Sequence, residues 1–212
     1  MRRVRTAILI SGRGSNMEAL VRAARTDDHP AEIVLVGSNR PEAAGIKFAS
    51  DAGLPTVVVD HKTFGKAREA FERALHTELK KHDVELVCLA GFMRLLTPWF
   101  IGQWHDRLIN IHPSLLPLFK GLHTHQRALE AGVKLHGCTV HVVRPDMDAG
   151  PIIAQSAVPV LDDDDPDTLA ERVLVAEHAL YQHALAHVAQ GILDGSWAIK
   201  DERVSGVPPF GA

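Results

Sequence analysis

Short apolar segments alternate with amphipathic segments along the first half of the chain, and this alternation restricts the fold more than any other feature of the sequence. The apolar segments are residues 4–10, 32–37, 56–59, 85–90 and 107–111, and their content of Val, Ile and Leu predicts buried strands. The segments between them with apolar side chains at helical spacing are residues 17–25, 43–52 and 66–81. Strands that alternate with helices form parallel βαβ units. We therefore predict an α/β fold with a doubly wound, mostly parallel twisted sheet flanked by helices.

The pattern changes after His112, where a proline-rich loop begins. The elements expected beyond it are a helix near residues 126–131, antiparallel strands at residues 138–143 and 151–160, and a long helix from Pro166 to about Gln190. The tail from Trp197 is expected to add an edge strand before Pro208. No repeat or linker divides the sequence, so we predict a single domain over residues 1–212.

The charge balance and the cysteines restrict the partners. Lys and Arg total 23 and Asp and Glu total 26, a formal net charge of −3, which is unlike that of proteins that coat nucleic acid or lie on membranes. We find no apolar stretch of bilayer-spanning length and no recognisable signal peptide. Cys88 and Cys138 lie in apolar runs without metal or redox spacing, which suits a reducing compartment. We expect a cytoplasmic monomer or homodimer that binds small molecules, and neither nucleic acid nor membranes.

A glycine-rich loop, residues 11–16, joins the first predicted strand to the first predicted helix. This geometry aims backbone N–H groups at an anion, and Gly12 and Gly14 permit its close approach. Ser15 or Asn16 is expected to cap the helix. A tight strand-to-helix turn that binds nothing remains the alternative.

The loop lacks the marks of two common nucleotide sites. A dinucleotide fingerprint needs a third glycine where this chain has Met17, and an acidic residue where it has Ser38 and Asn39. The Gly-Lys-Ser/Thr of a Walker loop is absent. A single phosphate monoester is therefore the better ligand, and a dinucleotide oxidoreductase is disfavoured.

Asn110 and His112 end the fifth predicted strand and lie two residues apart, so they project from the same face. An amide and an imidazole that face one pocket can both donate hydrogen bonds to a developing oxyanion. The sequence has no Gly-x-Ser-x-Gly elbow, which argues against an acyl-enzyme and for a nucleophile supplied by the substrate. From spacing alone, Asn110 is equally well a turn residue and His112 a satisfied core histidine.

Six segments around these residues form an ordered set of motifs. They are Ile10–Asn16, Leu89–Leu96, Asn110–Pro117, Gly121–His125, Gly137–Val143 and Asp148–Ile153. Together they resemble the folate-dependent formyltransferases, in the branch that formylates glycinamide ribonucleotide for purine synthesis. The resemblance covers roughly residues 4–190.

The resemblance implies roles for individual residues. Asn110, His112 and Asp148 match the catalytic trio of the family. The implied reaction moves the formyl group of 10-formyltetrahydrofolate, a co-substrate, to the amine of glycinamide ribonucleotide by direct attack through a tetrahedral oxyanion. Asn110 and protonated His112 would stabilise the oxyanion, while Asp148 would favour the imidazolium and accept the amine proton.

The resemblance also implies two binding regions. Residues of about 1–105 would bind the phosphate and ribonucleotide, and residues of about 106–200 would carry catalysis and most folate contacts. The implied ribonucleotide contacts are Gly14, Ser15, Asn16 and Glu177. The implied folate contacts are Arg68, Met93, Arg94, Leu95, Leu96, Asn110, Arg144, Pro145, Asp146, Met147 and Asp148. Without the resemblance, core packing would be the preferred reading of the Met93–Leu96 run.

Other readings of the sequence are weaker. His123 and His125, with His112 or His136, suggest a metal site, but partners at a metal spacing are missing, so we expect no metal. The nearest alternatives are two other members of the same family. A methionyl-tRNA formyltransferase is disfavoured because it should carry a basic C-terminal domain, and a formyltetrahydrofolate hydrolase is disfavoured because it should carry an N-terminal regulatory domain. A ligand-binding regulator would not need the trio. The acidic run Asp162–Asp165 is expected to cap the long helix.

Overall fold

The computed structural model describes residues 2–199 and contains one sheet of seven strands in the order β3-β2-β1-β4-β5-β6-β7. The strands are β1 (Val4–Ile10), β2 (Ala31–Ser38), β3 (Thr56–Val58), β4 (Leu86–Leu89), β5 (Leu108–His112), β6 (Leu135–Val142) and β7 (Ile152–Pro159). The strands from β3 to β5 are mutually parallel, whereas β6 is antiparallel to both of its neighbours. The strand order turns back between β1 and β4. Open α/β sheets bind ligands at such a point.

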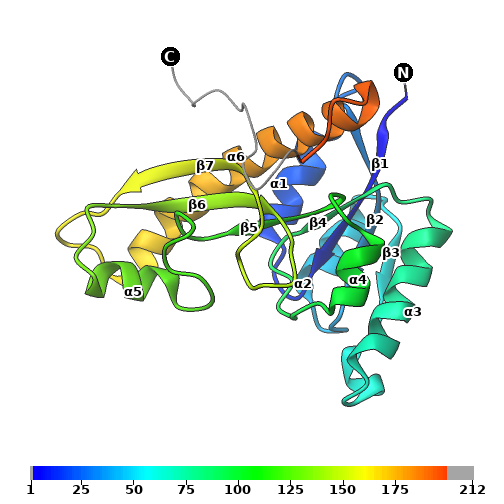
Figure 1. Ribbon diagram of the computed structural model, residues 1–212, viewed down its shortest axis with the longest axis horizontal. Helices are drawn as coiled ribbons and strands as arrows, with labels where there is room; N and C mark the ends of the chain where they lie inside the picture. Colours follow the sequence, from blue (N-terminus) through cyan, green and yellow to red (C-terminus); the bar gives the residue numbers. More distant parts are fainter. Residues whose placement is uncertain (1, 200–212) are drawn as a thin grey trace.

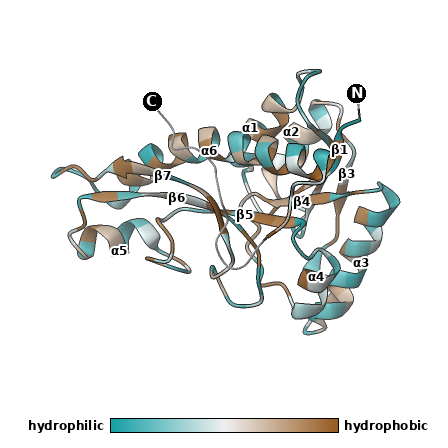
Figure 2. Ribbon diagram, turned by 45° about the horizontal axis from the view of Figure 1, so that its top comes forward, coloured by the Kyte–Doolittle hydropathy of each residue, from teal (hydrophilic) through white to brown (hydrophobic). Residues whose placement is uncertain are grey.

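Helices cover both faces of this sheet (Figure 1). They are α1 (Ser15–Ala23), α2 (Ala44–Asp51), α3 (Arg68–Lys81), α4 (Pro98–Gln103), α5 (Thr124–Glu130) and α6 (Pro166–Asp194), with a 3₁₀ turn η1 (His61–Phe64). One buried apolar cluster joins α1, α2, α5 and α6 to the sheet, and a second joins α3 and α4 to the opposite face. Figure 2 shows apolar residues along the strands and polar residues on the outer sides of the helices. The prediction of a doubly wound sheet flanked by helices is confirmed.

Alternate residues of β5 and β6 pack into the first cluster and leave the residues between them facing the other way. Ile109 and Ile111 belong to the cluster on the α6 side, as do Cys138, Val140 and Val142. Asn110 therefore projects from the opposite face, together with its cross-strand partner His141, and so does His112 with its partner Thr139. This register sets four polar side chains side by side on one face of the sheet.

The long helix α6 is fixed at its start and near its middle. Asp165 caps it by accepting hydrogen bonds from the backbone N–H groups of Asp167 and Thr168, and the Thr168 side chain completes a capping box. The buried Tyr181 hydroxyl lies 3.1 Å from the carbonyl oxygen of Leu89 on β4 and 3.2 Å from that of Ile109 on β5. The prediction that the acidic run caps this helix is confirmed.

Differences from the predicted elements lie at ends and in short segments. Both antiparallel strands are present, β6 begins three residues earlier than predicted, and α6 extends to Asp194. The sequence patterns did not predict η1 or α4, because each is too short to repeat a helical period. The predicted edge strand in the tail lies mostly outside the described residues.

Candidate active site

A pocket of about 250 Å³ opens at the point where the strand order turns back. Its lining comes from the segments that follow β1, β2 and β4, namely Ser11–Asn16, Arg40, Ala90, Gly91 and Met93. Ser11 joins the three segments, because its hydroxyl donates to the Asn39 side chain at 2.6 Å and accepts from the Met93 N–H at 2.8 Å. The two cations that line the pocket, Arg13 and Arg40, and the start of α1 favour an anionic ligand.

The glycine loop turns directly into α1, and this corrects one prediction. Ser15 and Asn16 do not cap the helix. The N-cap is Gly14, which has φ +80° and no side chain to accept a hydrogen bond. The left-handed conformation makes the turn tighter than predicted, so Ser15 is already the first helical residue. The first-turn N–H groups then remain available to an anion.

Asn16 joins this pocket to α6. Its side-chain amide donates to Glu177 Oε2 at 2.8 Å, although the two residues are 161 positions apart. Glu177 is 7% exposed, and burial raises the pKa of its carboxyl to about 7 despite the Asn16 hydrogen bond. The structure thus brings together Gly14, Ser15, Asn16 and Glu177, all four of the expected ribonucleotide contacts.

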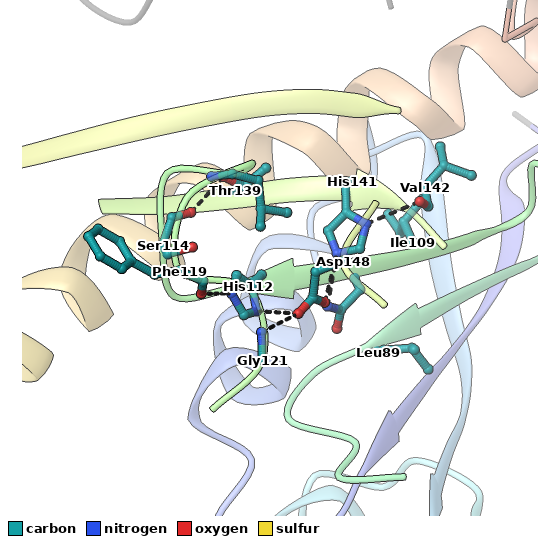
Figure 3. A network of polar contacts seen from close by, with 12 residues as sticks. Leu89, Ile109, His112, Ser114, Phe119, Gly121, Thr139, His141, Val142 and Asp148 are labelled. Carbon is teal, nitrogen blue, oxygen red and sulfur yellow. Dashed lines mark hydrogen bonds and ion pairs between the residues drawn. The ribbon is translucent and has the colours of Figure 1, made fainter. Parts of the chain in front are cut away.

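The expected catalytic trio also converges on one place, at the carboxyl end of β5. Asp148 Oδ2 lies 3.5 Å from His112 Nδ1, and Asp148 Oδ1 lies 3.8 Å from His141 Nε2. The Asn110 amide nitrogen lies 3.1 Å from the same His141 nitrogen. Figure 3 shows His112 and His141 on either side of Asp148. Because Asn110 pairs with Leu89 of β4 in the sheet, the trio and the pocket share one edge.

The loop after β5 closes over this group. His112 Nε2 lies 3.1 Å from the Phe119 carbonyl oxygen, and the Gly121 N–H donates to Asp148 Oδ2 at 2.8 Å (Figure 3). Asp148 has φ +49°, a left-handed conformation that aspartate tolerates better than most residues. Two residues later, a Cβ at Gly150 would lie 1.7 Å from the Val142 carbonyl oxygen, so only glycine fits there. The backbone itself therefore fixes the position of the carboxylate.

The first expected folate segment, residues 93–96, is divided: Leu96 packs against the second apolar cluster, whereas two of its apolar side chains are exposed. Met93 and Leu95 are 59% and 60% exposed. The segment is tied to α3, where the Arg94 guanidinium lies 5.3 Å from the Phe71 ring centre and Glu72 accepts from the Thr97 N–H. Arg68 is an exposed residue at the start of the same helix, one turn before Glu72. Met93 and Leu95 therefore present an apolar surface at the rim of the pocket, which Met93 also lines.

The second expected folate segment, residues 144–148, follows β6. Met147 is 52% exposed, and Pro145 and Asp146 are also exposed. Arg144 is half-buried and forms an ion pair with Asp106. The structure therefore exposes three residues of this segment, places Asp148 in the trio and pairs Arg144 with Asp106.

The histidines weighed above as metal ligands include a neighbouring pair, His125 and His136. The rings of His125 and His136 meet edge to face with centroids 5.3 Å apart, and burial lowers the pKa of His136 to about 4. Among residues 2–199, no group of three or more His, Cys, Asp or Glu side chains is arranged to hold a metal ion. In the same part of the chain, no helix is long and apolar enough to span a bilayer.

Sequence reasoning gave no role to Ser11, Arg40 or His141. Ser11 follows β1 directly, and that position at the turning point of the sheet was the available signal. Arg40 follows β2, whose carboxyl end reaches the same edge. His141 lies opposite Asn110 across the β5–β6 pair, so the two side chains project from the same face of the sheet. This could not be predicted from the sequence because it depends on the register of the two strands.

Comparison with known proteins agrees with this geometry. The family model described as formyl transferase matches residues 4–185. The trifunctional purine biosynthetic protein adenosine-3 of Drosophila melanogaster is 50% identical over 192 residues, which are 90% of this chain and 14% of that protein. The phosphoribosylglycinamide formyltransferase of Escherichia coli K12 is 42% identical over 186 residues, which are 88% of this chain and 87% of that protein.

A solved structure gives the same result. The crystal structure of phosphoribosylglycinamide formyltransferase from Brucella melitensis superposes with a TM-score of 0.85 at 56% identity, and the match covers 90% of this chain and 97% of that one. This chain thus spans only a small part of the trifunctional relatives and most of the length of the bacterial proteins. Because the family model covers most of the sequence, the chain belongs to the formyl transferase family.

Proposed function

We propose that this protein transfers the formyl group of 10-formyltetrahydrofolate to the amine of glycinamide ribonucleotide, a step of purine biosynthesis. The observation that carries the proposal is the convergence of Asn110, His112 and Asp148 at the same sheet edge as the glycine-loop pocket. The names of the bacterial relatives, which the chain matches over most of their length, support the same substrate.

The ribonucleotide phosphate would lie at the glycine loop. The N–H groups of the first turn of α1 and the guanidinium groups of Arg13 and Arg40 supply the donors that a phosphate dianion needs. Glu177, held by Asn16, would accept a hydrogen bond from a ribose hydroxyl. The amine of the substrate would then extend along the edge towards β5.

The formyl folate would bind next to the trio, on the surface that Met93 shares with the glycine-loop pocket. The exposed apolar side chains of Met93, Leu95 and Met147 fit the faces of a flat ring, and the backbone of residues 144–148 offers donors and acceptors to its edge. Arg68 and Arg94 add positive charge beside this surface, which suits the carboxylates of a folate tail.

The residues can perform the chemistry of amine formylation. Attack of the amine on the formyl carbon forms a C–N bond and a tetrahedral oxyanion, and collapse breaks the bond to the folate nitrogen, which takes up a proton. The Asn110 amide would donate to the oxyanion, and so would Nε2 of the protonated His112 ring once it exchanges the Phe119 carbonyl oxygen for the substrate. The Asp148 carboxylate, 3.5 Å from His112, would stabilise the imidazolium and accept the proton that the amine loses.

We also propose a cytoplasmic location, because both free thiols, Cys88 and Cys138, are buried in the apolar core as expected in a reducing compartment.

The direct test is a spectrophotometric assay. The protein is mixed with a formyl folate donor and glycinamide ribonucleotide, and the absorbance of the deformylated folate is followed. A parallel reaction without the ribonucleotide separates transfer from hydrolysis. Folate release that needs the ribonucleotide supports the proposal, whereas equal release without it would show a hydrolase.

A further inference from the structure

We infer that His141 is a positioning residue that orients the Asn110 amide towards the reacting formyl oxygen. This inference rests on the proposed function. The two residues face each other directly across the antiparallel β5–β6 pair, and His141 Nε2 lies 3.1 Å from the Asn110 amide nitrogen. His141 is 2% exposed, so it is almost wholly shielded from bulk solvent.

The hydrogen bonds of His141 define its tautomer. Nδ1 lies 3.1 Å from the Val142 carbonyl oxygen, which can only accept, so Nδ1 carries the hydrogen (Figure 3). In a neutral ring, Nε2 is then an acceptor. The group facing it at hydrogen-bonding distance must be a donor, which identifies the Asn110 NH₂ rather than the amide oxygen.

This assignment fixes the direction of the whole amide. One Asn110 N–H points at His141, so the second N–H is left to donate towards the edge of the sheet where the formyl oxygen would lie. If His141 carried a second proton, Nε2 would become a donor and the amide would turn its oxygen towards the ring. The donor that the oxyanion needs would then be displaced. Asn110 thus depends on a neutral His141.

The surroundings keep the second proton off His141. Burial lowers the pKa of its ring, and the nearby His112 and Lys120 act in the same direction, against Asp148 and the Val142 carbonyl. Asp148 is also nearer to His112, at 3.5 Å, than to His141, at 3.8 Å. The two rings therefore share one carboxylate, with Asp148 closer to His112 and burial favouring a neutral His141.

The test compares two substitutions of His141. His141→Phe keeps a ring but removes the acceptor, and His141→Gln keeps an acceptor for the Asn110 amide. We expect His141→Phe to lower kcat by at least about tenfold, but by no more than the factor of about 10²–10³ that follows loss of an oxyanion donor itself, with the KM for the ribonucleotide nearly unchanged. His141→Gln should recover part of the rate. The matched control is His76→Phe, because His76 packs between Trp99 and Trp104 in the second apolar cluster, on the α3 and α4 side of the sheet.

A double-mutant cycle with Asn110→Ala separates positioning from general damage. If His141 acts through Asn110, His141→Phe should change kcat by less than about threefold once the amide is gone. Equal losses in both backgrounds would overturn the inference. Full activity of His141→Phe would also overturn the inference, provided that the wild-type protein is active. An inactive wild-type protein would instead contradict the proposed function.

A spectroscopic measurement covers the case in which His141→Phe does not fold. Nitrogen NMR of the histidine rings in the wild-type protein should show His141 protonated only at Nδ1 above pH 6.5, the ordinary pKa of the ring from which burial lowers it. A proton on Nε2 in this range would overturn the inference without any substitution.

Discussion

At the scale of the residue, Asp148 meets three groups at once, the rings of His112 and His141 and the Gly121 N–H. Asp148→Asn keeps the size of the side chain and an oxygen for the Gly121 hydrogen bond but removes the charge. We expect kcat to fall by about 10²–10⁴, the range for loss of a proton-transfer group. The KM for glycinamide ribonucleotide should change little, because uniform binding is retained. Steady-state kinetics with both substrates measures this.

The same measurements on His112→Asn and on the double variant test whether the two groups act as a unit. The double variant should be much less damaged than the product of the two single losses. Near-normal turnover of Asp148→Asn would contradict the roles proposed here.

Glu177 makes stability depend on pH in a direction opposite to that of an ordinary surface carboxyl. Its pKa is raised from 4.5 to about 7 in the folded protein, so between these values the folded state binds more protons than the unfolded state. The free energy of unfolding contributed by this group therefore falls as the pH rises from about 4.5 to 7. At pH 8, Glu177→Gln should be more stable than the wild type by about 1–3 kcal/mol.

Urea denaturation of both proteins at pH 5 and pH 8 measures this effect. At pH 5 the wild-type carboxyl is mostly protonated and the two proteins should be similar in stability. A variant whose advantage is the same at both pH values would show that the charge of Glu177 is not responsible.

At the scale of the element, the first turn of α1 is expected to bind only the phosphate end of the substrates. Ser15→Ala and Asn16→Ala should each raise the KM for glycinamide ribonucleotide by about tenfold, the loss of roughly 1.4 kcal/mol of hydrogen bonding. The KM for the folate should not change, because residues 93–96 and 144–148 belong to other segments. Ser50→Ala, an exposed position at the end of α2, is the matched control. A higher KM for folate in either variant would contradict this division.

The sequence is a good guide to elements whose information is local. The apolar runs of β1 and β4 predict buried strands because nearly every side chain in them contacts a core, and the spacing of Asn110 and His112 predicts their common face. The six-residue α4 is not predictable in this way, because it is too short to show a helical repeat of apolar residues and contains Pro98 and Gly102, which are poor helix formers. The Asn110–His141 contact depends on register between strands, and the Asn16–Glu177 contact on the docking of α6; both are tertiary.

At the scale of the whole molecule, the ribonucleotide-binding part expected at residues 1–105 and the catalytic part at 106–200 share one framework. The sheet runs through both without a break, and the apolar cluster on the α6 side contains residues of β1, β4, β5 and β6. The Tyr181 hydroxyl reaches carbonyl groups on β4 and β5, one in each part. We therefore propose that the two parts unfold together.

Pulse-labelling hydrogen exchange with mass spectrometry across a urea series tests this coupling. Peptides from β2 and from β6 should lose protection at the same urea concentration. Tyr181→Phe should lower that concentration for both sets equally, because it removes a buried hydrogen-bond donor, an effect of about 1–2 kcal/mol. If peptides from residues 106–199 lost protection while those from 1–105 stayed protected, the parts would be separate cooperative units. In that case, a substrate bound between the two parts would have to fix their relative position. In a single cooperative unit, by contrast, the phosphate pocket and the trio keep their spacing before either substrate binds.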